Sequence, residues 1–231
     1  MTKTRTGGRI LVDQLVAQGC ERLFTVPGES YLAVLDGLRD TGIRNVVCRQ
    51  EGGAAYMADA YGRATSSVGV AMVTRGPGAA NAFVAVHTAW QDASPLVLFV
   101  GLVPVPDRDR EAFQEFDPRA WFGSQAKRVL ILDNADRASE VVAEAFHAAR
   151  SGRPGPVIVG LPEDVVASGF AGELVEPYAT ATGAIAPEHI AELQASIAGA
   201  ERPLLFLAGE GWTDASATAV RSFAEQHELP V

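Results

Sequence analysis

Residues 68–81 read VGVAMVTRGPGAAN and hold a strand, a turn and the start of a helix. The stretch up to Thr74 is a continuous apolar run rather than an alternating one, which is typical of a strand covered on both faces. Gly-Pro-Gly at 76–78 then marks a tight turn. The segment 79–90 is apolar almost all round, so we expect a buried helix there. A strand that leads through a turn into a helix is the unit from which parallel sheets are built.

Runs of the same kind recur along the first two thirds of the chain. They are LFTV at 23–26, VVC at 46–48, PLVLFVG at 95–101, RVLIL at 128–132 and PVIVGL at 156–161. Helical patterns lie between them, such as the spacing of four that joins Leu11 to Leu15 and Val142 to Phe146. Strands and helices that alternate six times predict an α/β fold, a six-stranded parallel sheet with helices on both faces.

The texture of the chain changes after Pro162, because few large apolar side chains follow until residue 187. We divide the chain into a first domain at 1–166, a linker at 167–186 and a second unit at 187–231. In the second unit we expect a helix from Pro187, a buried strand at 203–209 and a helix after Thr213. A helix–strand–helix stub cannot close a sheet, so this α/β unit is incomplete. We therefore expect the chain to be part of a longer protein or one half of a split one.

Composition excludes several classes of protein. The chain has 231 residues, of which 48% are hydrophobic and 20% charged, so it can bury a core and is neither disordered nor a disulfide-stapled miniprotein. A net charge of −9 argues against a nucleic-acid partner, which needs a basic face. Apolar runs are far shorter than the roughly 20 residues of a membrane helix, and the start lacks a secretory signal. Cys20 and Cys48 fit core positions of a cytoplasmic protein.

Three predicted strand ends carry unusual residues, and ligands of open α/β sheets bind beyond such ends. They read VPGES at 26–30, RQEGG at 49–53 and TRGPGAAN at 74–81. The third loop resembles a dinucleotide fingerprint but fails it, because Asn81 occupies the third glycine position and no acid follows the next strand. The sequence also contains no GxxxxGK phosphate loop and no His or Cys cluster for a metal.

Glu51 is the acid that needs an explanation. It follows a strand and begins a helix, where the helix dipole alone would favour an acid. Gly52 and Gly53 come directly after it. Glycine weakens a helix, so two glycines in the first turn indicate that something packs closely against the backbone there.

Four motifs in the same order make the sequence similar to a known family. They read QEGGAAYMADAYGRAT at 50–65, VGVAMVTRGPGAANAFVAVHTAWQDASPLVLFVG at 68–101, AFQEFD at 112–117 and GPVIVGLPEDV at 155–165. Together they resemble the pyrimidine-binding domain of thiamine diphosphate enzymes, and most of all the acetolactate synthase group. The resemblance covers residues 5–166, and residues 187–231 resemble the start of that family's central domain.

The resemblance implies a thiamine diphosphate cofactor, a 2-keto acid substrate and a catalytic role for Glu51. In the family this carboxyl shares its proton with a ring nitrogen of the aminopyrimidine, so we expect a buried, apolar surround that keeps it protonated. The cofactor-binding residues implied are Glu51, Gly76, Pro77, Gly78, Asn81 and Gln114. The substrate-facing residues implied are Pro27, Gly28, Phe113 and Gln114. Lys127 also matches the family, and we expect it to be a solvated charge.

The resemblance implies further components outside these residues. The family's GDG…N motif, which binds Mg²⁺ and diphosphate, lies several hundred residues further on, so we assign no metal ligand here and expect little cofactor binding by the chain alone. The resemblance leaves open whether the protein also binds a flavin (FAD). The family arrangement, with its cofactor between two subunits, implies a homodimer or tetramer.

Departures from the family pattern leave alternatives open. Residues 26–29 read Val-Pro-Gly-Glu where the typical synthase has Tyr-Pro-Gly-Gly, so Val26 and Glu29 differ from the family pattern. Arg49 stands where a histidine is common beside the acid. A non-oxidative 2-keto acid decarboxylase therefore remains an alternative to a synthase that decarboxylates and ligates. A non-catalytic half-subunit that completes a site with another chain is a second alternative. A nucleotide-binding domain with no thiamine role is a third.

Overall fold

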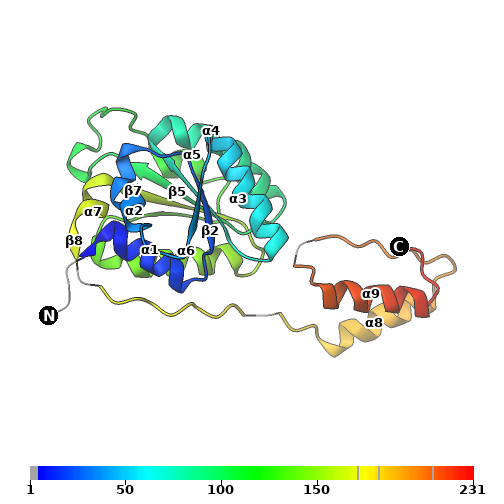
Figure 1. The fold of residues 1–231 in the computed structure, drawn as a ribbon. Helices are drawn as coiled ribbons and strands as arrows, with labels where there is room; N and C mark the ends of the chain where they lie inside the picture. The colour runs from blue at the N-terminus through cyan, green and yellow to red at the C-terminus, as the bar shows by residue number, and fades with distance from the viewer. Residues whose placement is uncertain (1–4, 171, 182, 210) are drawn as a thin grey trace. The chain divides into compact units, whose positions relative to one another are not determined.

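The computed structural model describes residues 5–170, 172–181, 183–209 and 211–231 (Figure 1). The chain separates into two compact units, residues 1–180 and residues 181–231.

One parallel sheet forms the centre of the first unit. Its strands, in spatial order, are β3 (Arg44–Val47), β2 (Arg22–Thr25), β4 (Gly69–Thr74), β5 (Leu96–Leu102), β7 (Pro156–Pro162) and β6 (Arg128–Ile131). Every neighbouring pair is parallel. The predicted six-stranded parallel sheet is therefore confirmed, with each strand in the expected run of sequence.

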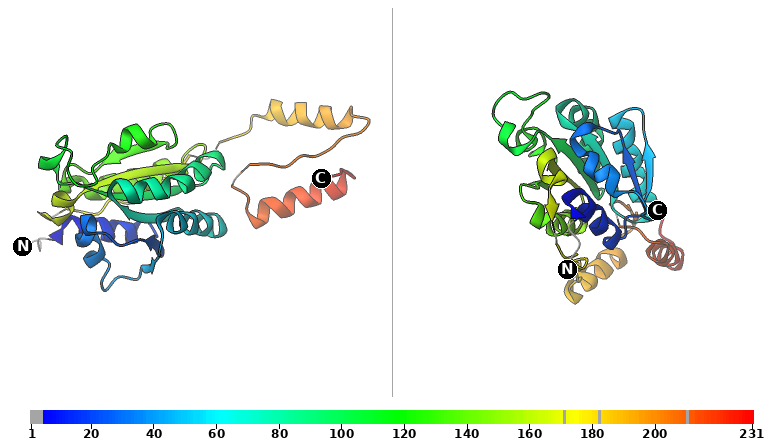
Figure 2. Two further views of the ribbon diagram at one scale, coloured as in Figure 1. Left: turned by 90° about the horizontal axis from the view of Figure 1, so that it is seen from above. Right: turned by 60° about the vertical axis from the view of Figure 1, so that its left-hand side comes forward.

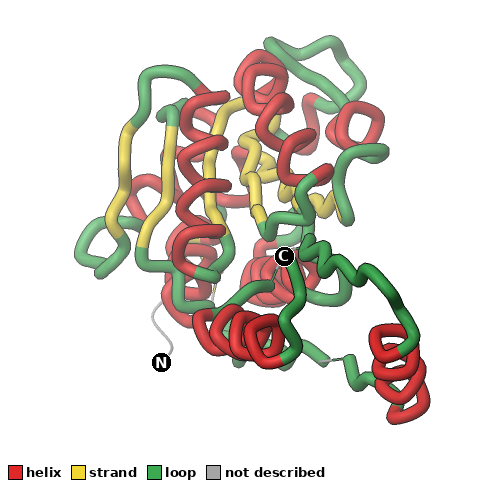
Figure 3. Tube along the Cα trace, turned by 90° about the vertical axis from the view of Figure 1, so that its right-hand side faces the viewer, coloured by secondary structure: helices red, strands yellow, loops and turns green. Residues whose placement is uncertain are grey.

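Helices cover both faces of the sheet, which gives three layers (Figures 2 and 3). One face carries α1 (Gly7–Ala17), α2 (Leu32–Gly37), α6 (Ala138–Arg150) and α7 (Glu163–Ala167). The other carries α3 (Glu51–Thr65), α4 (Arg75–Gln91) and α5 (Pro118–Phe122). Short turns of 3₁₀ helix are η1 (Glu29–Tyr31), η2 (Val105–Asp107) and η3 (Ala135–Arg137). Among the described residues, no helix combines the length and apolarity that a membrane crossing requires.

The central strand β5 shows why its sequence is apolar without alternation. Val97 and Phe99 belong to the core beneath α1 and α6. Leu98 and Val100 belong to the core beneath α3 and α4. Successive side chains of a strand point to opposite faces, so a strand covered on both faces needs apolar residues throughout.

Helix α4 is not buried all round as predicted. Ala82, Ala85 and Ala89 are fully buried, but Val84 is 51% exposed and Asn81 is exposed too. Small side chains bring α4 close to the sheet and to α3, which leaves its outer stripe open. The apolar residues on that stripe therefore lack a partner within the first unit.

Helix α7 ends the segment that we assigned to the first domain, and strand β8 (Gly169–Phe170) lies at the start of the segment 167–186 that we assigned to the linker. Strand β8 pairs antiparallel with β1 (Arg5–Thr6). Val165 and Val166 of α7 are buried in the core below α1. Two apolar side chains in a short segment are enough to dock it, although the average composition indicates a loop.

The second unit contains α8 (Pro187–Ala198) and α9 (Asp214–Gln226), and Thr213 forms a capping box with Ser216 as expected for a helix start. The predicted strand at 203–209 is wrong, because Leu204 is 70% and Phe206 85% exposed. A strand is stabilised by backbone pairing with a neighbour. The described residues of this unit contain no strand that could pair with it, so the apolar run is irregular.

Candidate active site

Loops from four strand ends meet at the carboxyl edge of the sheet. The turn after β2 contacts the end of β4, since a Cβ atom added to Gly28 would lie 2.3 Å from the Cβ of Thr74. The hydroxyls of Ser30 and Thr74 are 2.6 Å apart. Only glycine fits at position 28, so the predicted substrate-facing turn is held against the predicted cofactor-binding turn.

Glu51 lies at this edge, in the first turn of α3. The side-chain amide of Asn81 on α4 donates a hydrogen bond of 2.8 Å to its Oε2. A Cβ atom added to Gly78 would lie 3.6 Å from Glu51 Oε1, and one added to Gly52 would lie 2.9 Å from the Asn81 carbonyl oxygen. The structure thus brings together Glu51, Gly78 and Asn81, which the sequence placed in one site.

The surround of Glu51 differs from the expectation. We expected the residue to be buried, but it is half-buried in the described chain. The reason is its position, because the first turn of α3 lies beside the open stripe of α4. Pro27 and Pro77 are also exposed at this edge. Burial from within the first unit is therefore incomplete around the carboxyl.

Tyr31 anchors the loop after β2, and its role was not predicted from the sequence. It is fully buried, and its hydroxyl donates to the carbonyl oxygens of Val26 and Met72. Burial raises the pKa of Tyr31, and the negative charge of Glu51 raises it further. The phenol therefore stays neutral and ties the loop after β2 to β4. An aromatic residue directly after Pro-Gly-Glu-Ser was the available signal.

Arg75 is the second residue that sequence reasoning missed. It follows β4 directly and begins α4, with Gly-Pro-Gly after it in the first helical turn. Its φ of 45° is a left-handed conformation that costs a non-glycine residue about 1–2 kcal/mol. The residue is only 8% exposed. Its guanidinium pairs with Glu29 at 3.2 Å and with Glu163 at 3.0 Å. A charged residue between an apolar strand and a glycine turn was the signal for it.

Phe113 and Gln114 lie on the loop that follows β5, against the start of α4. The backbone amide of Gly76 donates a hydrogen bond of 3.0 Å to the Gln114 carbonyl oxygen. A Cβ atom added to Gly76 would lie 3.1 Å from that oxygen, so the glycine permits the close approach. Phe113 is 71% exposed and is not a core aromatic. The structure therefore brings Gln114 to the predicted glycine turn and leaves the Phe113 ring open to the edge.

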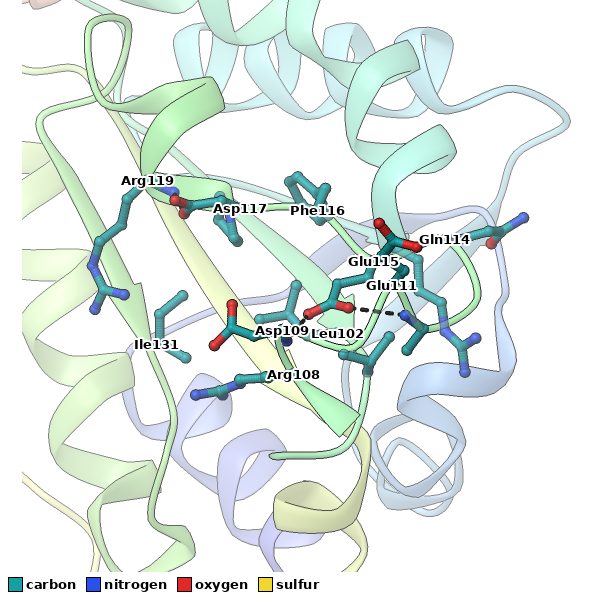
Figure 4. Close-up of a pocket in the computed structure, with 14 residues that line it drawn as sticks. Leu102, Arg108, Asp109, Glu111, Gln114, Glu115, Phe116, Asp117, Arg119 and Ile131 are labelled. Carbon is teal, nitrogen blue, oxygen red and sulfur yellow. Dashed lines mark hydrogen bonds between the residues drawn. The ribbon is translucent and has the colours of Figure 1, made fainter. Parts of the chain in front are cut away.

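The same loop is fastened by Glu115. Its carboxylate accepts hydrogen bonds from the backbone amides of Asp109 at 2.7 Å and Ala112 at 2.9 Å (Figure 4). These bonds lower the pKa of Glu115, with that from Asp109 the largest cause. Asp109 and Gln114 have positive φ values of 61° and 60°. An ionised carboxylate thus stabilises a backbone that favours glycine.

A cavity of about 790 Å³ opens between this loop and the ends of β5 and β6. Arg75 and Gln114 line it, but Glu51 and Gly28 do not. Its other charged lining residues have both signs: Arg108, Asp109, Glu111, Glu115, Asp117 and Arg119. The cavity is therefore distinct from the carboxyl site, although Arg75 and Gln114 lie on its wall.

Lys127 is not the solvated charge that we expected. Its ammonium donates to the carbonyl oxygens of Ala148 and Ser151 at the end of α6. Burial lowers the pKa of Lys127, and the nearby charge of Arg153 lowers it further. A cation that satisfies the last carbonyls of a helix has a structural role.

The two cysteines carry unreactive thiols. Burial raises the pKa of Cys20 to about 12 and also raises the pKa of Cys48. The thiolate is the reactive form, so neither side chain offers a nucleophile near neutral pH.

The residues at the edge fit the pyrimidine end of thiamine diphosphate. Glu51 supplies a carboxyl, Asn81 fixes that carboxyl in place, and Gly78 puts no side chain beside it. Among the residues that the structure describes, no group of three His, Cys, Asp or Glu side chains is arranged to hold a metal.

Comparison with known proteins agrees with this geometry. Residues 5–121 match the family described as "Thiamine pyrophosphate enzyme, N-terminal TPP binding domain". The chain is 33% identical to the acetolactate synthase isozyme 2 large subunit of Escherichia coli (strain K12), over 97% of the chain and 41% of that protein. It is 36% identical to the acetolactate synthase large subunit of Parasynechococcus marenigrum (strain WH8102), over 99% of the chain and 39% of the relative. Identity to the catabolic acetolactate synthase of Raoultella terrigena is 37%, over 87% of the chain and 36% of the relative.

The matches extend along most of the chain but reach only part of each relative. The chain spans about two fifths of the length of the curated relatives it matches. The family model itself covers the sheet edge that carries Gly28, Glu51, Asn81 and Gln114. This chain therefore belongs to the thiamine pyrophosphate enzyme family and carries its N-terminal TPP-binding domain.

Proposed function

We propose that the chain is the N-terminal, pyrimidine-binding part of an acetolactate synthase-like enzyme that decarboxylates a 2-keto acid and ligates the product to an acceptor. The observation that carries the proposal is the Glu51 carboxyl, held by Asn81 beside the 76–78 turn at the carboxyl edge of the sheet. The acetolactate synthases to which the chain is similar support it.

The roles of the chain's own residues follow from this placement. Glu51 shares its proton with a ring nitrogen of the aminopyrimidine and so controls the tautomer of the ring. Gly76, Pro77 and Gly78 receive the flat face of that ring, and Asn81 keeps the carboxyl oriented. When bound, thiamine diphosphate supplies the nucleophilic carbon and the electron sink for decarboxylation.

Two loops that flank residues 76–78 form the substrate side of the site. Pro27 and Gly28 contribute to it from the loop after β2, and Phe113 and Gln114 contribute to it from the loop after β5. The pair Phe113–Gln114 favours the synthase reaction. Glu29 extends the first loop with a carboxylate that pairs with Arg75, and this departure favours the alternative of a simple 2-keto acid decarboxylase.

The remaining components are assigned outside this domain. Mg²⁺ and the diphosphate are held by a diphosphate domain, on the same polypeptide or on a separate one. The exposed apolar residues on the outer faces of α3 and α4 support a homodimer, since Tyr56, Met57 and Val84 are 40–51% exposed. Sedimentation velocity of the complete protein should show a dimer or tetramer, and a monomer at micromolar concentration contradicts this assembly.

The substitution Glu51→Gln in the complete protein tests the function. Gln keeps the size of the side chain but cannot share a carboxyl proton, so turnover of 2-keto acids should fall by about 10²–10⁴-fold. Stopped assays with a panel of 2-keto acids measure it. The matched control is Glu188→Gln, since Glu188 is also an acid in the first turn of a helix. A loss below tenfold in the Glu51 variant would mean that the acid only favours the helix dipole.

A further inference from the structure

We propose that Arg75 is a positioning residue that clamps the two substrate-facing loops to each other, and thereby sets the affinity for the 2-keto acid. The inference rests on the proposed function, because that function assigns the loops at 27–28 and 113–114 to the substrate. It adds a residue to which neither the sequence motifs nor the family match assigns a role.

The contacts of the guanidinium join three separate segments. Nη2 pairs with Glu29 Oε1 at 3.2 Å, directly after the turn at 27–28. The same nitrogen pairs at 3.0 Å with Glu163 Oε2, where β7 ends and α7 begins. Nη1 donates a hydrogen bond of 3.1 Å to the carbonyl oxygen of Phe113. One side chain therefore links the ends of β2, β5 and β7 to that of β4.

The aromatic ring of Phe113 adds a fourth contact. The central carbon of the Arg75 guanidinium lies 5.8 Å from the centre of that ring, within the range of a cation–π interaction. Phe113 is otherwise largely exposed, and its neighbour Gln114 accepts the Gly76 amide hydrogen bond. Arg75 and Gly76 thus hold successive residues of the same loop.

The backbone conformation of Arg75 indicates that these contacts are needed. Non-glycine residues with positive φ are uncommon and cluster at functional sites. A glycine would adopt the φ of 45° at Arg75 without strain. A long charged side chain is present there instead, and it is largely buried.

The charges around Arg75 indicate what removal of its guanidinium would do. Glu29 and Glu163 both pair with the same nitrogen of Arg75, so removal of the guanidinium leaves two like charges facing each other. Glu29 is the more exposed of the two, so the turn at 27–28 is the part expected to shift. None of these contacts involves Glu51 or Asn81, and the proton function of Glu51 should therefore survive.

The test uses the complete protein and three variants. Arg75→Met removes the charge and the donors at similar length, and Arg75→Lys keeps the charge but cannot reach all acceptors. Arg137→Met is the matched control, because Arg137 pairs with Glu140 on the surface, away from the loops. KM and kcat for the best 2-keto acid are measured together with hydrogen–deuterium exchange of peptides covering 26–31 and 108–117.

The clamp predicts a KM at least fivefold higher in Arg75→Met, a kcat changed by a smaller factor, and faster exchange in both peptides. Arg75→Lys should lie between Arg75→Met and the parent in KM. Equal changes in KM and kcat, an unchanged KM or unchanged exchange overturns the proposal, and so does any difference seen equally in Arg137→Met. The exchange measurement does not depend on turnover. If Glu51→Gln keeps full activity while exchange responds to Arg75→Met, the proposed function fails and the contact itself stands.

Discussion

Glu115 shows how one side chain fixes the conformation of a loop at this site. Its carboxylate accepts backbone amides of a segment in which Asp109, Glu111 and Gln114 all have positive φ. Replacing the acceptor with a neutral amide should loosen the segment, because Gln presents only one weaker acceptor oxygen. The loop that carries Phe113 and Gln114 thus depends on a carboxylate that binds backbone amides of the same loop.

The pH dependence of that loop follows from the lowered pKa of Glu115. A carboxyl whose pKa is lowered in the folded state stabilises it above the ordinary value of about 4.3, and the stabilisation is lost as pH falls through the lowered value. Glu115→Gln should therefore speed trypsin cleavage after Arg108 and Arg110 at pH 7. Amide exchange of residues 108–117 should differ between parent and variant at pH 7 and converge under acid.

Another carboxylate of the chain provides the control for the Glu115 variant. Glu144→Gln removes another paired surface carboxylate, which bonds Arg128 outside the loop, and should leave cleavage in the loop unchanged. If cleavage after Arg108 and Arg110 is the same in the Glu115 variant and the parent at pH 7, the carboxylate does not fasten the loop.

At the scale of elements, the first turn of α3 contains two glycines with different surroundings. A Cβ atom on Gly52 would lie 2.9 Å from the Asn81 carbonyl oxygen, whereas one on Gly53 meets only a Gln50 oxygen at 3.8 Å. Gly52→Ala should lower the free energy of unfolding by about 1–3 kcal/mol, since backbone must shift. Gly53→Ala should raise it by up to about 1 kcal/mol, since alanine favours the helix.

Urea denaturation of the 231-residue chain measures both values, and each variant is the control for the other. Stabilisation by both substitutions would show that α3 and α4 are not packed as closely as the structure has them. Stabilisation by Gly53→Ala would also bear on assembly. The single chain has free space for a side chain at this position, so a glycine there is explained by the close approach of another chain.

Much of the element scale could be predicted from sequence, and the failures have physical causes. Strand β5 was found because apolar residues without alternation suit a strand covered on both faces. The prediction of a strand at 203–209 was wrong, because apolar residues form a strand only where a neighbouring strand can pair with them. The prediction that α4 is buried all round was wrong for a related reason, since composition does not show which face of a helix meets another element.

The site itself was predicted in part. Glu51, Gly78 and Asn81 were identified by motif and lie together. Arg75 and Tyr31 were missed, because their importance comes from partners distant in sequence: Glu163 in one case and Met72 in the other. The burial of Glu51 was overestimated, because the sequence does not show that the first turn of α3 lies beside the open stripe of α4.

At the scale of the whole molecule, the second unit contributes little core of its own. Helix α8 has no buried residue and α9 buries only Ala224 among the described residues. Units that bury so little apolar surface are marginal in isolation. The stability of the chain should therefore reside in the three-layer first unit, which also carries the whole of the candidate site.

The affinity of the chain for its cofactor is the property that depends on the molecule as a whole. In the proposed function, the first unit offers Glu51, Asn81 and glycine-lined backbone to a pyrimidine ring. Charge-assisted contacts to diphosphate are the stronger ones, and the described residues provide no metal cluster for that end. We therefore predict that calorimetric titration of the 231-residue chain with Mg²⁺ gives similarly weak binding of thiamine and thiamine diphosphate. A dissociation constant near 1 μM for the diphosphate, about −8.2 kcal/mol, or a tenfold preference over thiamine would require a diphosphate site within these residues. Glu51→Gln serves as the control, because it should weaken both ligands equally if the pyrimidine end alone is bound.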